Sequence, residues 1–143
     1  MDLRANIIEL LVLHTGKKPD RINSADIFRG NGYEGDDGDE LIVAFSEAFD
    51  VDISTFNHVF HYIGDEPPGH RRVFPVDAEE KEIPFVPVSV DMLVHAAEQH
   101  KWHYPYPEHT IRITLRSRIF QAGLIALVSA GAIILLLMKY SNL

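Results

Sequence analysis

The sequence has no cysteine among its 143 residues. Without a thiol the chain can form no disulfide, no thiolate nucleophile and no cysteine-ligated zinc site, and this composition is compatible with a cytoplasmic location. The sequence also lacks acidic residues beyond Glu108, although it has 21 of them in all. Only basic residues carry charge after that point: Arg112, Arg116, Arg118 and Lys139. The chain is therefore divided into a long acidic part and a short basic end.

The acidic part indicates which kind of partner the protein has. The formal net charge of the chain is −8, although every charge after Glu108 is positive. Nucleic acid binding requires a basic face toward the phosphates, so this composition argues against it. Complementary electrostatic fields steer protein association. The sequence therefore favours a protein partner with a basic surface.

Recognised catalytic and metal-binding motifs are missing as well. The eight histidines include the close pairs His58/His61 and His100/His103, but no His-Glu-x-x-His spacing occurs. The acidic run 36–40 lacks the alternating ligands and the terminal glutamate of an EF-hand. We expect packing or surface roles for the histidines and predict no catalytic residue, no metal and no cofactor. The sequence therefore predicts that the protein is not an enzyme.

Hydrophobic periodicity predicts an all-α fold for the acidic part. Asp2 and Ser89 are expected helix N-caps, and Gly16 is an expected helix end. A two-proline linker should follow at 105–118, and an irregular insertion should occupy about 64–87. The predicted helices span residues 2–14, about 37–49, 54–62 and 87–102.

The second of these helices has an acidic entry and one apolar stripe. Leu41, Phe45, Ala48 and Phe49 fall at helical spacing and should face the core. The carboxylates at its start should cap free amides and oppose the positive end of the helix dipole. The same solvated face could bind a basic partner. The residues predicted to carry that binding are Asp36, Asp37, Asp39, Glu40 and Glu47.

The end of the chain predicts one transmembrane helix. Residues 119–138 contain no charge, and about 20 residues at ~1.5 Å rise cover the roughly 30 Å of a bilayer core. The three arginines before this span outweigh Lys139 after it, so the positive-inside rule places the preceding domain in the cytoplasm. Residues 110–115 alternate in polarity and could form a strand, although we expect helix there.

Small residues recur at intervals of about four along the predicted span. Small side chains let helices approach closely and can drive association in a bilayer, although single-span helices that associate with nothing also contain them. The candidate packing residues are Ala122, Gly123, Ala126 and Ala130.

Residues 1–104 resemble acyl carrier proteins. The matching segments are Glu-Leu-Ile at 40–42, Phe-Ser-Glu-Ala-Phe at 45–49 and Asp-Ile at 52–53. A closer resemblance is to a bacterial family of small acyl-carrier-like proteins, domain-of-unknown-function family fourteen-ninety-three. It is carried by Gly-Asp-Asp-x-x-Glu-Leu at 35–41, Phe-x-Val-Asp-Ile-Ser at 49–54, and the segment from Pro87 through Ala-Ala to Trp102.

This resemblance implies a fold more than an activity. In carrier proteins a serine at the start of the second helix holds a phosphopantetheine arm, and the registers that align here offer no serine. Ser24 is the weak candidate among the remaining serines. In carriers the acidic face of that helix meets basic patches on client enzymes. The resemblance thus implies a degenerate carrier fold that keeps the recognition face.

The sequence as a whole predicts a cytoplasmic acyl-carrier-like domain at 1–104, a juxtamembrane linker, a single inner-membrane span at 119–138 and a short tail at 139–143. The expected function is a non-enzymatic, membrane-tethered protein-interaction module. Two alternatives stay open: a true carrier modified at a non-standard serine, or an accessory or inhibitory subunit of a membrane protein complex that acts mainly through its transmembrane helix.

Overall fold

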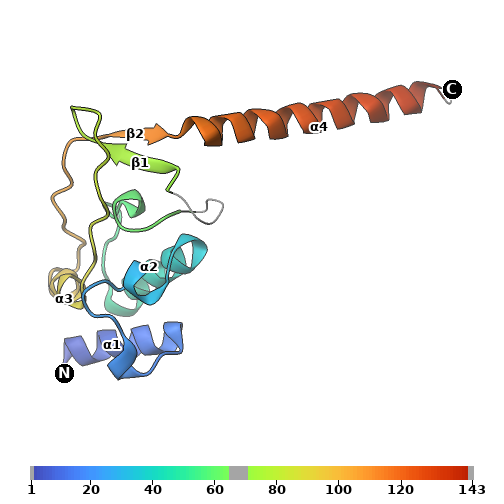
Figure 1. Cartoon of the computed structure of the whole chain (residues 1–143). Helices are drawn as coiled ribbons and strands as arrows, with labels where there is room; N and C mark the ends of the chain where they lie inside the picture. The colour runs from blue at the N-terminus through green and yellow to red at the C-terminus, as the bar shows by residue number, and fades with distance from the viewer. Residues whose placement is uncertain (1, 65–70, 142–143) are drawn as a thin grey trace.

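The computed structural model describes residues 2–64 and 71–141. Three helices enclose the core of the domain, a two-stranded sheet lies beside them, and a long helix projects away (Figure 1). The helices of the domain are α1 (Leu3–Thr15), α2 (Gly35–Phe49) and α3 (Val90–Gln99). The strands are β1 (Val73–Val76) and β2 (Thr110–Ile113), and the long helix is α4 (Leu115–Ser141).

Helix ends follow the local signals in the sequence. The Asp2 carboxylate accepts the Ala5 amide at 3.3 Å, and the Ser89 hydroxyl accepts the Met92 amide at 3.2 Å. These two caps satisfy amides that have no partner inside the helix. Gly16 ends α1 in the left-handed conformation, with φ 65°. The predicted caps at Asp2 and Ser89 and the predicted stop at Gly16 are confirmed.

The core lies where the three helices meet. Each helix contributes fully buried apolar side chains, and Trp102 folds back to join them. In α2 the buried positions include Ile42 as well as the predicted Leu41 and Phe45, whereas Ala48 is exposed. The apolar stripe is therefore rotated slightly from the predicted one. The largest buried members of the core are Trp102, Tyr62, Phe28, Phe45, Ile7, Leu11, Ile27, Leu41 and Leu93.

The prediction of an all-α fold is wrong. β1 and β2 pair antiparallel, with Val73 opposite Ile113 and Val76 opposite Thr110. β1 comes from the predicted irregular insertion, and β2 from the segment that we expected to be helical. The alternating pattern of residues 110–115 was the correct signal. It pairs with a strand distant in sequence, so local periodicity alone did not decide between strand and helix.

The predicted third helix at 54–62 is replaced by turns and a 3₁₀ turn at His58–Phe60. The Ser54 amide donates to the Asp52 carboxylate at 2.9 Å, which forms a turn instead of a helix cap. The side chains of Phe60, His61 and Tyr62 are all buried. Three consecutive residues do not share one side of a helix, so an irregular path buries them better.

The predicted linker is packed against the domain. The Tyr106 ring lies 4.8 Å from the Phe60 ring, and the His109 ring lies 4.7 Å from it on centroids. β2 then leads directly into α4. Among the described residues, α4 is the only helix that is long and apolar enough to cross a membrane. Its segment Arg118–Ser141 has a mean hydropathy of 2.3 and no buried residue.

Candidate functional site

The predicted partner-binding carboxylates all lie on α2 and are exposed. The helix is held by Leu41 and Phe45, whose side chains are each 1% exposed in the core. That packing turns the opposite side of the helix to solvent. Asp36 and Asp37 lie in the first turn, where negative charge interacts favourably with the helix dipole. The structure thus brings together the set that the sequence singled out: Asp36, Asp37, Asp39, Glu40 and Glu47.

These carboxylates have no cation beside them in the part of the chain that the structure describes. Of the salt bridges formed there, none involves an acidic residue of α2. Asp39 accepts the Tyr62 hydroxyl at 2.6 Å, which is a bond to a neutral group. The helix itself contains no basic residue. Its acidic face therefore keeps an uncompensated negative field, which is the form of surface that attracts a basic partner.

A groove of about 440 Å³ runs beside this face. Val43 is 46% exposed in it, and Ala44 also lines it. Carboxylates surround this apolar patch. The lining residues are His14, Asp39, Glu40, Val43, Ala44 and Glu47. The contribution of α1 to this groove could not be read from sequence, because it depends on how the two helices pack.

The start of α2 does not fit a phosphopantetheine arm. The amide of Gly35 donates to the Ile63 carbonyl at 2.7 Å, and Gly35 has φ 59°. Gly38 is packed so closely that an added Cβ would lie 2.8 Å from the Tyr62 ring. A serine that carries an arm needs an exposed hydroxyl at this helix start. The chain offers none there.

Ser24, the weak candidate, lies in a bend and not at a helix start. Its carbonyl accepts the Val90 amide at 2.9 Å, so it holds the entry of α3 against the first loop. Its side chain is only partly exposed. This position lacks the acidic helix start on which carrier modification depends.

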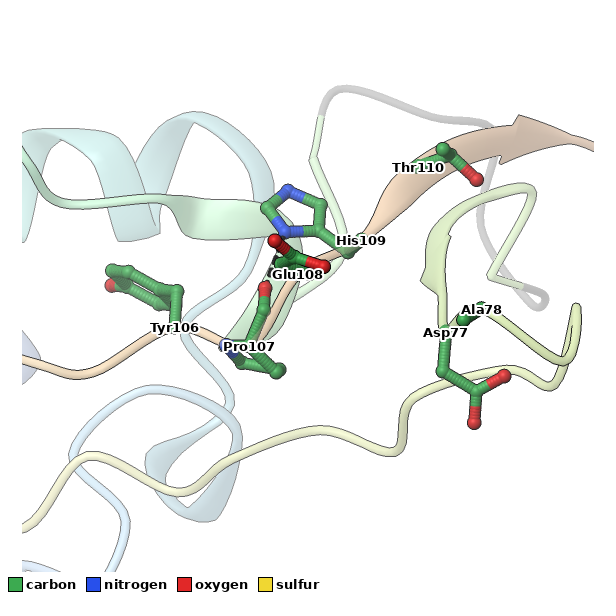
Figure 2. Close-up of a pocket in the computed structure, with 7 residues that line it drawn as sticks. All are labelled: Asp77, Ala78, Tyr106, Pro107, Glu108, His109 and Thr110. Atoms are coloured by element: carbon green, nitrogen blue, oxygen red, sulfur yellow. Dashed lines mark hydrogen bonds between the residues drawn. The ribbon is translucent and has the colours of Figure 1, made fainter.

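A second cleft, of about 540 Å³, was not anticipated from the sequence. The turn after β1 forms one side, and the segment that leads into β2 forms the other (Figure 2). The Asp77 carboxylate accepts the Glu79 and Lys81 amides at 2.9 Å each, and its side chain extends away from the His109 ring. His109 contacts the Pro107 carbonyl at 2.8 Å through Nδ1. Both side chains are thus engaged in local turns and form no nucleophile–base pair with each other.

The two histidine pairs predicted to have packing or surface roles lie in different surroundings. His61 is 1% exposed, and both of its ring nitrogens have partners in the domain. His100 ends α3 in the left-handed conformation and contacts the Asp50 carbonyl at 2.9 Å. Within residues 2–64 and 71–141, no three histidine or carboxylate side chains are grouped as metal ligands would be.

The small residues of the predicted span lie on the exposed α4 helix. A Cβ added at Gly123 would meet no other group within 4 Å. At four-residue intervals Ala122, Ala126 and Ala130 lie on nearly one side of the helix. Their packing against another helix stays a prediction.

Comparison of the chain with family models, with curated proteins and with solved structures found no match. The resemblance to acyl carriers therefore depends on short matches in the sequence, at 35–42, 45–54 and 87–102.

Proposed function

We propose that the protein is a non-enzymatic, membrane-tethered interaction module that presents the acidic face of α2 to a protein partner with a basic surface. The observation that carries this proposal is the set of exposed α2 carboxylates without a neighbouring cation among the described residues. Asp36 and Asp37 interact favourably with the helix dipole, but Glu40 and Glu47 lie beyond the first turn, where that contribution fades. The field is instead available to a partner.

The groove gives this face a second means of recognition. Val43 and Ala44 lie in a lining that also contains Glu40 and Glu47. Apolar contact at the centre of an interface supplies affinity, and charges at its edge supply orientation and association rate. The arrangement suits a partner with apolar residues flanked by lysine or arginine.

We further propose that α4 crosses the inner membrane and that the domain is cytoplasmic. The support is the length and apolarity of Arg118–Ser141, together with the arginines before it. The chain has no native cysteine, so a single Ser141→Cys substitution gives one labelling site. An impermeant maleimide should label this variant in intact cells, and labelling only after the cells are opened would overturn the orientation.

Charge reversal tests the acidic face. The variant Glu40→Lys/Glu47→Lys should abolish retention of partners when the tagged full chain is purified from detergent-solubilised membranes. The matched control is Glu9→Lys/Glu98→Lys, which makes the same charge change on exposed positions of α1 and α3. Equal retention by the two variants would overturn the acidic-face proposal.

A second function is favoured by a separate observation. α4 has no buried residue in its apolar segment, so its whole circumference could contact lipid or another helix inside a bilayer. Small residues along it would permit close approach of another helix. The protein would then be an accessory subunit of a membrane complex. Exchange of residues 119–138 for an unrelated apolar span would abolish partner retention in this case and preserve it if α2 is the determinant.

A further inference from the structure

The β1–β2 pairing gathers arginines at the start of α4. Arg112 lies opposite Phe74 in the sheet, and the Thr114 amide donates to the Arg72 carbonyl at 2.9 Å. Side chains alternate along a strand, so Arg72 and Arg112 project from the same face as diagonal neighbours. The sequence shows Arg112 near the span. Only the strand pairing shows that Arg72 is there too.

No separate linker divides these arginines from the apolar helix. β2 ends at Ile113 and α4 begins at Leu115, while the Arg118 amide donates to the Thr114 carbonyl at 3.2 Å. Arg118 is exposed at the first position of the apolar segment. Arg112 therefore lies six residues before the apolar segment, and the strand pairing brings Arg72 beside it.

Their distance from the bilayer can be estimated from the backbone. At about 1.5 Å per helical residue and ~3.3 Å per strand residue, Arg112 is at most roughly 15 Å from the level of Arg118. The headgroup region extends about 6 Å beyond the hydrocarbon core, and the Debye length at physiological salt is about 8 Å. Both Arg72 and Arg112 are thus within electrostatic reach of lipid headgroups.

The ion pair that Arg112 makes within the described residues is an exposed one. Glu80 lies 3.1 Å from Arg112, but its side chain is 75% exposed and that of Arg112 is 44% exposed. Exposed pairs of this kind bind weakly. Two neighbouring acids have cations of their own: Glu79 pairs with Lys81 at 2.9 Å, and Glu82 pairs with Arg71 at 3.1 Å. A negatively charged headgroup can therefore compete with Glu80 for the guanidinium.

We propose that Arg72, Arg112 and Arg118 form a binding surface for anionic lipid headgroups where α4 enters the membrane. Basic residues beside a span attract anionic lipid of the cytoplasmic leaflet. A soluble acidic partner is the less suitable occupant because these arginines lie next to the start of the apolar segment. The proposal depends on membrane insertion of α4, and it goes beyond the binding role of α2. It adds a lipid contact that fixes the domain against the membrane.

Lipid retention tests the proposal. The full chain is placed in nanodiscs of equal phosphatidylcholine and phosphatidylglycerol, and the lipids that remain bound after release are counted by native mass spectrometry. Phosphatidylglycerol should be enriched over its share of the disc. The variant Arg72→Gln/Arg112→Gln/Arg118→Gln should lower the ratio of bound phosphatidylglycerol to bound phosphatidylcholine at least fivefold, since each basic residue near the surface contributes about fivefold to that ratio.

Two further variants separate a local lipid site from a general effect of charge. Lys18→Gln/Arg21→Gln removes two exposed cations from the loop after α1 and should leave the enrichment unchanged. Glu80→Gln removes the competing carboxylate and should raise it. Equal retention of the two lipids by the unmodified chain, or an equal loss in the Lys18/Arg21 control, would overturn the lipid site. A chain that enters no disc would overturn membrane insertion and this inference together.

Discussion

The hydroxyl of Tyr106 lies 2.7 Å from Nε2 of His61, between the core and the segment that leads to α4. The same hydroxyl accepts the Trp102 indole N–H at 3.0 Å and the Asn57 amide at 3.1 Å. Its own hydrogen is therefore directed to His61 Nε2. We assign the remaining imidazole proton to Nδ1, which donates to the Val86 carbonyl at 2.9 Å.

Removal of this hydroxyl should destabilise the domain. In Tyr106→Phe the Trp102 and Asn57 donors lose their acceptor inside the packing, and a buried unsatisfied group costs about 1–3 kcal/mol. The free energy of unfolding can be followed by the fluorescence of Trp102, the only tryptophan. Tyr104→Phe is the control, because the Tyr104 hydroxyl makes no hydrogen bond within the described residues and its ring also lies against His61. Equal losses in the two variants would contradict the network.

Acid should destabilise the domain through His61. Burial lowers the pKa of this imidazole to about 4, and the nearby His58 adds to the lowering. The unfolded chain, with a pKa near the ordinary value of about 6.5, then binds the proton more readily than the folded domain. This contribution is fully present above pH ~6.5 and is lost as the pH falls toward ~4, to a total of about 3 kcal/mol.

Comparison of unfolding free energies at several pH values between about 7 and 4 measures this effect. His61→Gln should reduce by up to one the number of protons that the domain takes up on unfolding, which sets the slope of the unfolding free energy with pH. His95→Gln, at an exposed position of α3, should leave that slope unchanged. If His61→Gln does not fold, NMR titration of the unmodified domain gives the same information. A His61 pKa near the ordinary value would contradict the prediction.

The local features of the fold were predictable from the sequence. Capping residues and apolar spacing located α1 and α3, and the uncharged run located α4. Apolar spacing alone located α2, because the expected capping by its carboxylates does not occur: its N-cap, Glu34, makes no side-chain hydrogen bond to the helix. The carboxylates of α2 are exposed as expected because Leu41 and Phe45 fix which side of that helix faces the core. These properties depend on residues within one or two turns of each other.

The remaining features depend on contacts between distant segments. Val73 pairs with Ile113, which lies far along the chain, so neither strand was certain from its own pattern. The sequence placed His61 on a predicted helix and Tyr106 in a predicted linker, and their contact depends on packing between these distant segments. The groove beside α2 likewise needs His14 from α1. Periodicity describes one element and does not report such pairings.

At Gly38, helix propensity and packing predict opposite effects of an alanine substitution on the stability of the domain. It lies within α2, where a change from glycine to alanine would ordinarily stabilise by about 1 kcal/mol. An added Cβ, however, would lie 2.8 Å from the Tyr62 ring. That ring is 1% exposed and is held by its hydroxyl on Asp39, so it has little room to move. We expect Gly38→Ala to destabilise the domain by about 1–3 kcal/mol.

A double-mutant cycle isolates the cause. If the Tyr62 ring is the obstacle, the cost of Gly38→Ala should shrink toward zero or change sign when it is made together with Tyr62→Leu, because the smaller side chain vacates the space beside the helix. Additive losses in the double variant would show that another feature of α2 requires glycine. A close Gly38–Tyr62 contact would fix which side of α2 faces the core and so keep the carboxylates of its first turns exposed to a partner.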